Sequence, residues 1–145
     1  VVWNKDGAVL EVLAPNSQEY SNLNNYSVVL RLTYGEDSFL FTGDAEQESE
    51  EEMLAKGYDL SAGVLKCGHH GSDTSSSPPF LKAVSPSPAV ISCGEDNDYG
   101  HPNQETLDKL AQAGAEVYRT DTQGTILAQT QGEGVTFTTG LPSVK

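Results

Sequence analysis

Four side chains of this sequence have the chemistry to bind a metal ion, and all four follow short apolar segments. Asp44 comes directly after SFLFTG, His69 and His70 come after GVLKCG, and His101 lies a few residues beyond PAVISCG. A carboxylate and imidazoles supply the oxygen and nitrogen ligands that zinc, manganese or iron take. A metal held with an open coordination position activates water. The chemistry that these residues favour is therefore metal-assisted hydrolysis.

Predicted strands and helices must position these side chains. Short apolar runs bounded by turn residues predict strands at 38–42, 63–66 and 88–92. A helix is predicted after each strand: one over 45–57, one from Ser77-Pro78 to before Pro86, and one that carries Leu107 and Leu110 and ends at Gly114. In α/β sheets, sites gather beyond the carboxyl ends of the strands. We therefore expect Asp44, both adjacent histidines and His101 to converge on one edge.

Further strands are expected on both sides of this central part. They cover residues 8–13 and 27–34 before it, and 116–120, 124–130 and 134–139 after it. The turn-rich segment 14–25 is expected on the surface. Alternating strands and helices with strands at both ends predict an α/β sandwich. No repeat or low-complexity linker divides the chain, so residues 1–145 are expected to form a single domain.

Other catalytic interpretations find less support. The GxSxG pattern that would expose a nucleophilic Ser72 is absent. Cys67 and Cys93 lack a CxxC spacing, follow apolar strands and are expected to be buried, although the sequence does not determine whether they pair. Lys66 ends the strand that leads to the histidine pair, where it would meet a substrate phosphate as a point charge or lie as an ordinary exposed lysine.

The charge of the chain disfavours a passive DNA-binding module. Twenty-one acidic and eight basic residues give a formal net charge of −13, which repels a phosphate backbone unless a cation offsets it. A well-solvated domain carries such a charge as well. No apolar run approaches the roughly 20 residues that cross a bilayer, so this piece is expected to be soluble.

Three segments in order resemble a known family. These are NNYSVVLRLTYGEDSFLFTGDAE, VLKCGHHGSDTSSS and PAVISCGEDNDYGHPNQETLDKL. Together they resemble the metallo-β-lactamase domain of the ComEC family of bacterial DNA-uptake proteins, over nearly the whole chain. The combination of FTGD, LKxGHHGS and NxYGHP is far more specific than any one motif. The resemblance implies the C-terminal half of an αββα sandwich.

The resemblance also implies a dinuclear site for divalent metals, zinc or manganese. Asp44 matches the aspartate that bridges the two metals, and His70 matches a metal-ligating histidine. His101 matches a group that contacts phosphate or donates a proton, with metal ligation as the alternative. His69 either orients the substrate or supports its loop. For catalysis we therefore consider His101, His69 and Lys66.

One departure from the family limits activity. The HxDxDH motif, which supplies most metal ligands in the family, is absent from this sequence, so the chain holds at most half of the site. At the position where many relatives have a further histidine, it offers Asn24, Asn25 and Ser27.

The resemblance implies a DNA-degrading hydrolase on the extracytoplasmic face of the bacterial membrane, with the membrane channel as its partner. This piece alone would be inactive and would not bind nucleic acid stably. The alternatives are a non-catalytic interaction module of the channel, and an esterase or lactonase.

Overall fold

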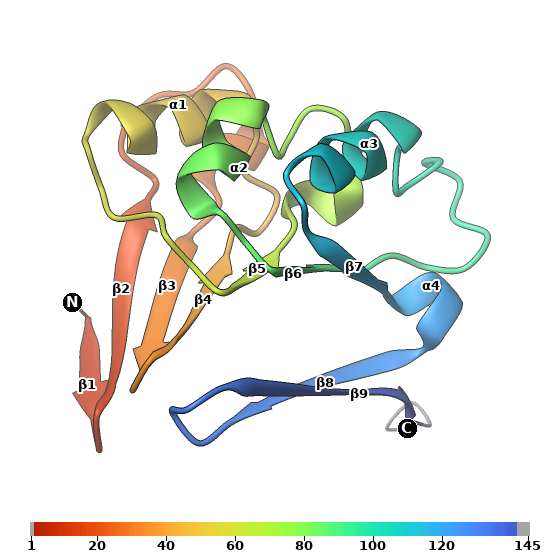
Figure 1. The fold of residues 1–145 in the computed structure, drawn as a ribbon. Helices are drawn as coiled ribbons and strands as arrows, with labels where there is room; N and C mark the ends of the chain where they lie inside the picture. Colours follow the sequence, from red (N-terminus) through yellow and green to blue (C-terminus); the bar gives the residue numbers. More distant parts are fainter. Residues whose placement is uncertain (1, 142–145) are drawn as a thin grey trace.

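A seven-stranded mixed sheet forms the centre of the computed structural model, which describes residues 2–141 (Figure 1). The strands lie side by side in sequence order: β1 Trp3–Lys5, β2 Ala8–Ala14, β3 Val29–Tyr34, β4 Asp37–Phe41, β5 Val64–Lys66, β6 Pro88–Ile91 and β7 Glu116–Arg119. Strands β1 to β4 are antiparallel, whereas β4, β5, β6 and β7 run parallel. The carboxyl ends of the four parallel strands therefore point to the same edge.

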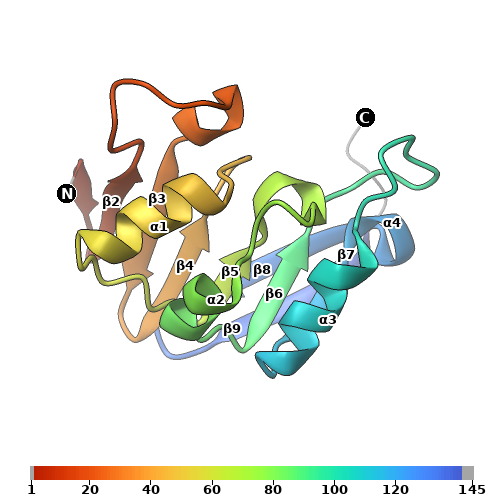
Figure 2. The same ribbon diagram turned by 90° about the horizontal axis from the view of Figure 1, so that it is seen from above.

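Helices cover one face of this sheet (Figures 1 and 2). They are α1 Gln47–Ala55, α2 Pro78–Val84 and α3 Gln104–Gln112, each of which connects two parallel strands. Alternate strand residues such as Leu40, Leu65 and Ile91 are fully buried in the core that also contains Met53, Phe80 and Leu110. Two 3-10 helices, η1 Leu23–Tyr26 and η2 Gly68–Gly71, lie in the loops. This layer fixes the strands whose ends carry the candidate site.

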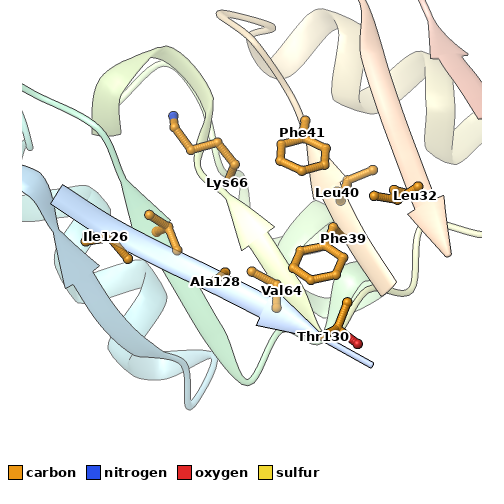
Figure 3. A pocket seen from close by; sticks show the side chains of 10 residues that line it. Leu32, Phe39, Leu40, Phe41, Val64, Lys66, Ile126, Ala128 and Thr130 are labelled. Carbon is orange, nitrogen blue, oxygen red and sulfur yellow. The ribbon is translucent and has the colours of Figure 1, made fainter. Parts of the chain in front are cut away.

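A two-stranded hairpin covers part of the opposite face. It consists of β8 Thr125–Thr130 and β9 Val135–Leu141 and follows the short α4 Thr120–Gln123. Tyr118 of β7 stacks on Phe137 of the hairpin, with ring centroids 4.7 Å apart. Between hairpin and sheet lies an apolar groove of about 350 Å³ (Figure 3). Its lining includes Phe39, Val64 and Ile126, and Phe41 at one end is 40% exposed.

The predicted α/β class is confirmed, and the layers of helices, sheet and hairpin are consistent with a portion of the sandwich that the resemblance implies. The strand β1 was not predicted, because WNK has no apolar alternation and pairs only through its hairpin with β2. The expectation that 14–25 lies on the surface is wrong at Ala14 and Asn25, which are 0% and 1% exposed. The Asn25 side chain accepts the backbone N–H of Glu46 at 2.9 Å, and this contact offsets its burial.

Candidate functional site

The loops after β4, β5 and β6 bring the four predicted side chains together at one edge of the sheet. Asp44 Oδ1 lies 3.4 Å from His70 Nε2. The ring of His69 lies 6.4 Å from that of His70 and 5.6 Å from that of His101, measured between centroids. The predicted convergence is thus confirmed, although these distances do not test the role of each residue.

The histidine loop has an unusual backbone. His69, His70 and Gly71 are consecutive left-handed residues, with φ of 46°, 56° and 83°. Such conformations cost about 1–3 kcal/mol each in residues other than glycine and persist only where the surroundings enforce them. The His69 N–H donates to the Gly43 carbonyl at 3.0 Å, and the Asn103 N–H donates to the Gly71 carbonyl at 2.9 Å. Neighbouring loops therefore hold the strained loop from both sides.

The glycines of GHHG allow this close approach. A Cβ on Gly68 would lie 3.0 Å from the Ala45 carbonyl oxygen, and a Cβ on Gly71 would lie 2.7 Å from Pro102 Cβ. Gly68 thus packs the histidine loop against the loop after β4, and Gly71 packs it against the loop after β6. The three loops form one packed unit.

Asp44 and His70 have a geometry that suits two ligands of one metal ion. Two atoms each about 2.1 Å from a tetrahedral ion lie about 3.4 Å apart, and this is the separation of Oδ1 and Nε2. His70 Nδ1 lies 2.7 Å from the Ser92 carbonyl oxygen. Because a carbonyl only accepts, Nδ1 carries a proton, and in the neutral ring Nε2 is then the nitrogen with the lone pair. The orienting contact to His70 thus comes from a backbone carbonyl.

The side chains fit a metal only as part of a larger donor set. Among residues 2–141, no group of three or more His, Cys, Asp or Glu side chains is arranged to hold a metal ion. Both members of the pair remain accessible, since the side chains of Asp44 and His70 are 45% and 52% exposed. This chain therefore offers an accessible pair of donors, to which further ligands would have to be added.

His69 is held by a carboxylate that sequence reasoning missed. Its Nδ1 lies 3.2 Å from Glu46 Oε1 and 3.3 Å from Thr74 Oγ1. The same Glu46 oxygen accepts from the Asn24 amide at 2.9 Å. These contacts hold the His69 ring within the loop cluster. Glu46 stands in an acidic run that already suits a helix start, so no sequence signal singled it out.

His101 lies between the histidine loop and an exposed aromatic ring. Burial is the main cause that lowers the pKa of His101. His69 and His70 lower it further when they are protonated, while Asp73 and Asp44 act in the opposite direction. Its ring stacks on Tyr99 with centroids 5.8 Å apart. The lowered pKa favours the neutral imidazole, which can accept a proton or coordinate a metal.

Lys66 is only partly accessible. Burial lowers its pKa, and its ammonium donates to the Cys67 carbonyl at 2.9 Å. Figure 3 shows its carbon chain along the apolar groove, with the nitrogen directed away from Val64 and Thr130. The Asp44 carboxylate favours the charged amine and partly opposes this lowering of the pKa. Lys66 is therefore not the ordinary exposed lysine that was the alternative interpretation of the sequence.

The cysteine and serine alternatives receive no support from the structure. Both cysteines are free thiols, and Cys67 is fully buried. Burial raises the pKa of the Cys67 thiol to about 12, which suppresses the nucleophilic thiolate. Ser72 is 4% exposed, and its hydroxyl lies 3.0 Å from that of Thr74. Both residues support the loop.

Comparison with known proteins identifies the family to which this chain belongs. The sequence profile of the metallo-β-lactamase superfamily matches residues 2–95. The chain belongs to the metallo-β-lactamase superfamily. Members of this superfamily typically bind divalent metal ions, in agreement with the donor pair at the sheet edge.

Three relatives of this metallo-β-lactamase chain are competence proteins of the ComEC family, as the motifs implied. It is 41% identical to ComE operon protein 3 of Bacillus subtilis over 115 residues, or 79% of this chain and 15% of the relative. Competence protein ComA of Neisseria gonorrhoeae is 41% identical over 86% of this chain and 18% of its own length. Recombination protein 2 of Haemophilus influenzae is 32% identical over 86% of this chain and 16% of its own length. The chain thus spans less than a fifth of each of these relatives.

A second acidic residue, Glu50 of α1, holds the segment that follows the histidine loop. It is 2% exposed and accepts the backbone N–H groups of Ser76 at 2.6 Å and Ser77 at 2.9 Å. Ser76 and Ser77 lie directly before α2, whose N-cap is Ser77, and their buried N–H groups need an acceptor. The segment that follows the histidines is thereby fixed to α1.

No helix in residues 2–141 has the length and apolar character needed to cross a membrane.

Proposed function

We propose that this chain is the C-terminal portion of a metal-dependent phosphodiesterase domain that hydrolyses DNA during competence DNA uptake. The observation that carries the proposal is the Asp44–His70 pair, whose 3.4 Å separation suits two ligands of one ion. Two divalent metals, zinc or manganese, are proposed for the complete domain, and further ligands would come from the upstream HxDxDH motif of the family. The chain alone would be inactive.

Each side chain at the edge has a proposed task. Asp44 and His70 would hold metal, with the Ser92 carbonyl fixing the His70 ring. When bound, the metal would supply Lewis-acid charge and a water of lowered pKa. Neutral His101 would contact the phosphate or exchange a proton, and Lys66 would offset phosphate charge from the adjoining strand end. His69, held by Glu46, would keep the loop in register.

The proposed setting is the extracytoplasmic face of the bacterial membrane, within a larger channel protein. DNA would be the substrate of the whole protein. The acidic chain alone is not expected to bind nucleic acid stably, because its charge of −13 opposes a phosphate backbone. Bound divalent cations would locally reverse this repulsion.

The test compares this chain with the longer protein that includes the HxDxDH segment. Cleavage of labelled DNA is measured with manganese or zinc, and metal binding is measured separately by calorimetry. We expect cleavage only by the longer protein and its loss in Asp44→Asn. Asp73→Asn is the matched control, because Asp73 is an exposed carboxylate at the same edge.

The outcomes separate the alternatives. A longer protein that binds two metals yet leaves DNA intact would refute the nuclease and favour an esterase or lactonase, which a panel of small esters would then test. A longer protein that binds no metal would favour a non-catalytic interaction module. Equal loss of cleavage in Asp73→Asn would show that the carboxylate at position 44 has no special role.

A further inference from the structure

The loop after β6 presents a highly exposed aromatic ring beside the candidate site. The Tyr99 side chain is 82% exposed, although it adjoins His101 with an interplanar angle of 23°. No hydrogen bond within residues 2–141 involves its hydroxyl group. Tyrosine usually buries much of its ring and satisfies its hydroxyl when it packs in a fold. One face of this ring is therefore available to a ligand.

A small hollow lies directly against this ring. It has a volume of about 220 Å³ and is lined by His70, Cys93, Gly94, Asn97, Tyr99 and His101. Ligand pockets for drug-sized molecules occupy about 300–1,000 Å³, so this one suits a single flat group. A Cβ on Gly94 would meet only Asn97 Cβ, at 3.9 Å, so the hollow is unobstructed there. Because His70 is shared with the metal-binding pair, a group in the hollow lies beside the reacting centre.

The charges around the hollow select the kind of group. Glu95, Asp96 and Asp98 are exposed in the same loop. Their carboxylates repel phosphate from the Tyr99 side, whereas an uncharged aromatic ring meets no such penalty. Stacking of a nucleobase on an aromatic side chain is sequence-tolerant, because every base has a π-face. The hollow therefore suits an uncharged base better than a phosphate, and His70 in its lining adjoins Asp44.

We propose that Tyr99 and His101 form a stacking platform for the nucleobase next to the scissile phosphate, so that the substrate is single-stranded DNA. This inference rests on the proposed phosphodiesterase function and deepens it. A base within a duplex is stacked on both sides and must be extruded before it can lie on a protein ring, which costs a few kcal/mol. An unpaired base pays no such cost. The platform thus discriminates by strand state and not by sequence.

The test uses the full-length metal-loaded protein and two oligothymidylates, one intact and one with a single abasic position next to the cleavage point. We expect Tyr99→Ala to raise the KM for the intact strand by about 5- to 150-fold, the range that base stacking supports, with little change in kcat. Tyr99→Phe should keep the wild-type KM, and the abasic strand should not distinguish Tyr99→Ala from wild type. Trp3→Ala is the control, since Trp3 is 46% exposed on the far edge strand β1.

The failures of the two proposals are distinguishable. An equal KM increase on intact and abasic strands, or none on either, would overturn the platform while the nuclease stands. A KM for duplex DNA as low as that for the single strand would overturn the strand preference. If no DNA is cut at all, photocrosslinking of an iodouracil-substituted strand decides: a crosslink at Tyr99 keeps the platform as a binding site, and its absence from Tyr99 removes it.

Discussion

Replacement of Gly71 by alanine should destabilise the fold through its backbone conformation and through steric overlap with Pro102 and Ile91. At φ +83°, an alanine pays the left-handed backbone cost of about 1–2 kcal/mol. Its Cβ would also lie 2.7 Å from Pro102 Cβ and 3.2 Å from Ile91 Cγ2, inside the 3.5–4.0 Å optimum for carbon contacts. Overpacking of this kind costs about 1–3 kcal/mol. We expect Gly71→Ala to lose about 2–5 kcal/mol in total.

Gly114→Ala provides a matched control for this experiment. Gly114 has φ +77°, and a Cβ there meets nothing within 4 Å, so the control pays the backbone cost without the collision. Urea unfolding should separate the two variants by about 1–3 kcal/mol, and thermal unfolding by about 2–4 °C for each kcal/mol. Equal destabilisation would refute the packing of the histidine loop against Pro102. In the longer protein that includes the HxDxDH segment, metal affinity should fall in Gly71→Ala but not in Gly114→Ala, because the adjacent His70 must shift with the loop.

Two further predictions concern buried ionisable groups. Burial raises the pKa of Glu50, so its folded carboxyl holds a proton more tightly than the unfolded one. The free energy of unfolding should therefore fall as the pH rises from the ordinary glutamate pKa through the raised one. Urea titrations at several pH values should show this fall in the wild type and in Glu51→Gln, whose side chain is exposed. Glu50→Gln should abolish it. For the thiols, iodoacetamide at mildly alkaline pH should label half-buried Cys93 first and Cys67 only after unfolding, because Cys67 is fully buried with a pKa of about 12. Peptide mass spectrometry measures both rates, and equal labelling in the folded protein would contradict the buried position of Cys67.

The sequence predicted the parts of the fold that have strong local signals. Apolar runs that end at glycine and polar residues located β4, β5 and β6 within about two residues, and the three connecting helices followed from their start and stop residues. Since parallel strands end at a common edge, this pattern was sufficient to predict that Asp44, His70 and His101 converge. The sequence pattern could not predict the role of each residue, and the distances between the side chains do not test those roles.

The supporting contacts could not be predicted, because they depend on tertiary approach. Backbone groups such as the Ser92 carbonyl have no residue type to mark them, yet this carbonyl orients His70. Glu46 and Glu50 belong to an acidic run in which the charge pattern of a helix start hides which carboxylate turns inward. Local pattern thus identifies the side chains that meet at the site, and packing determines how they are held.

The strained histidine loop connects these contacts to function. Two successive left-handed histidines cost about 1–3 kcal/mol each, and glycine at either position would relieve that cost. Glycine, however, would remove the imidazole that points toward Asp44 or Glu46. The loop is held instead by hydrogen bonds from its neighbours, by the Gly68 and Gly71 contacts, and by Glu50 below. The fold thus uses stability from the surrounding loops to keep the His70 imidazole beside Asp44 and the His69 imidazole beside Glu46, where a relaxed loop would not place them. For His70 this is the preorganisation that the proposed metal site would require.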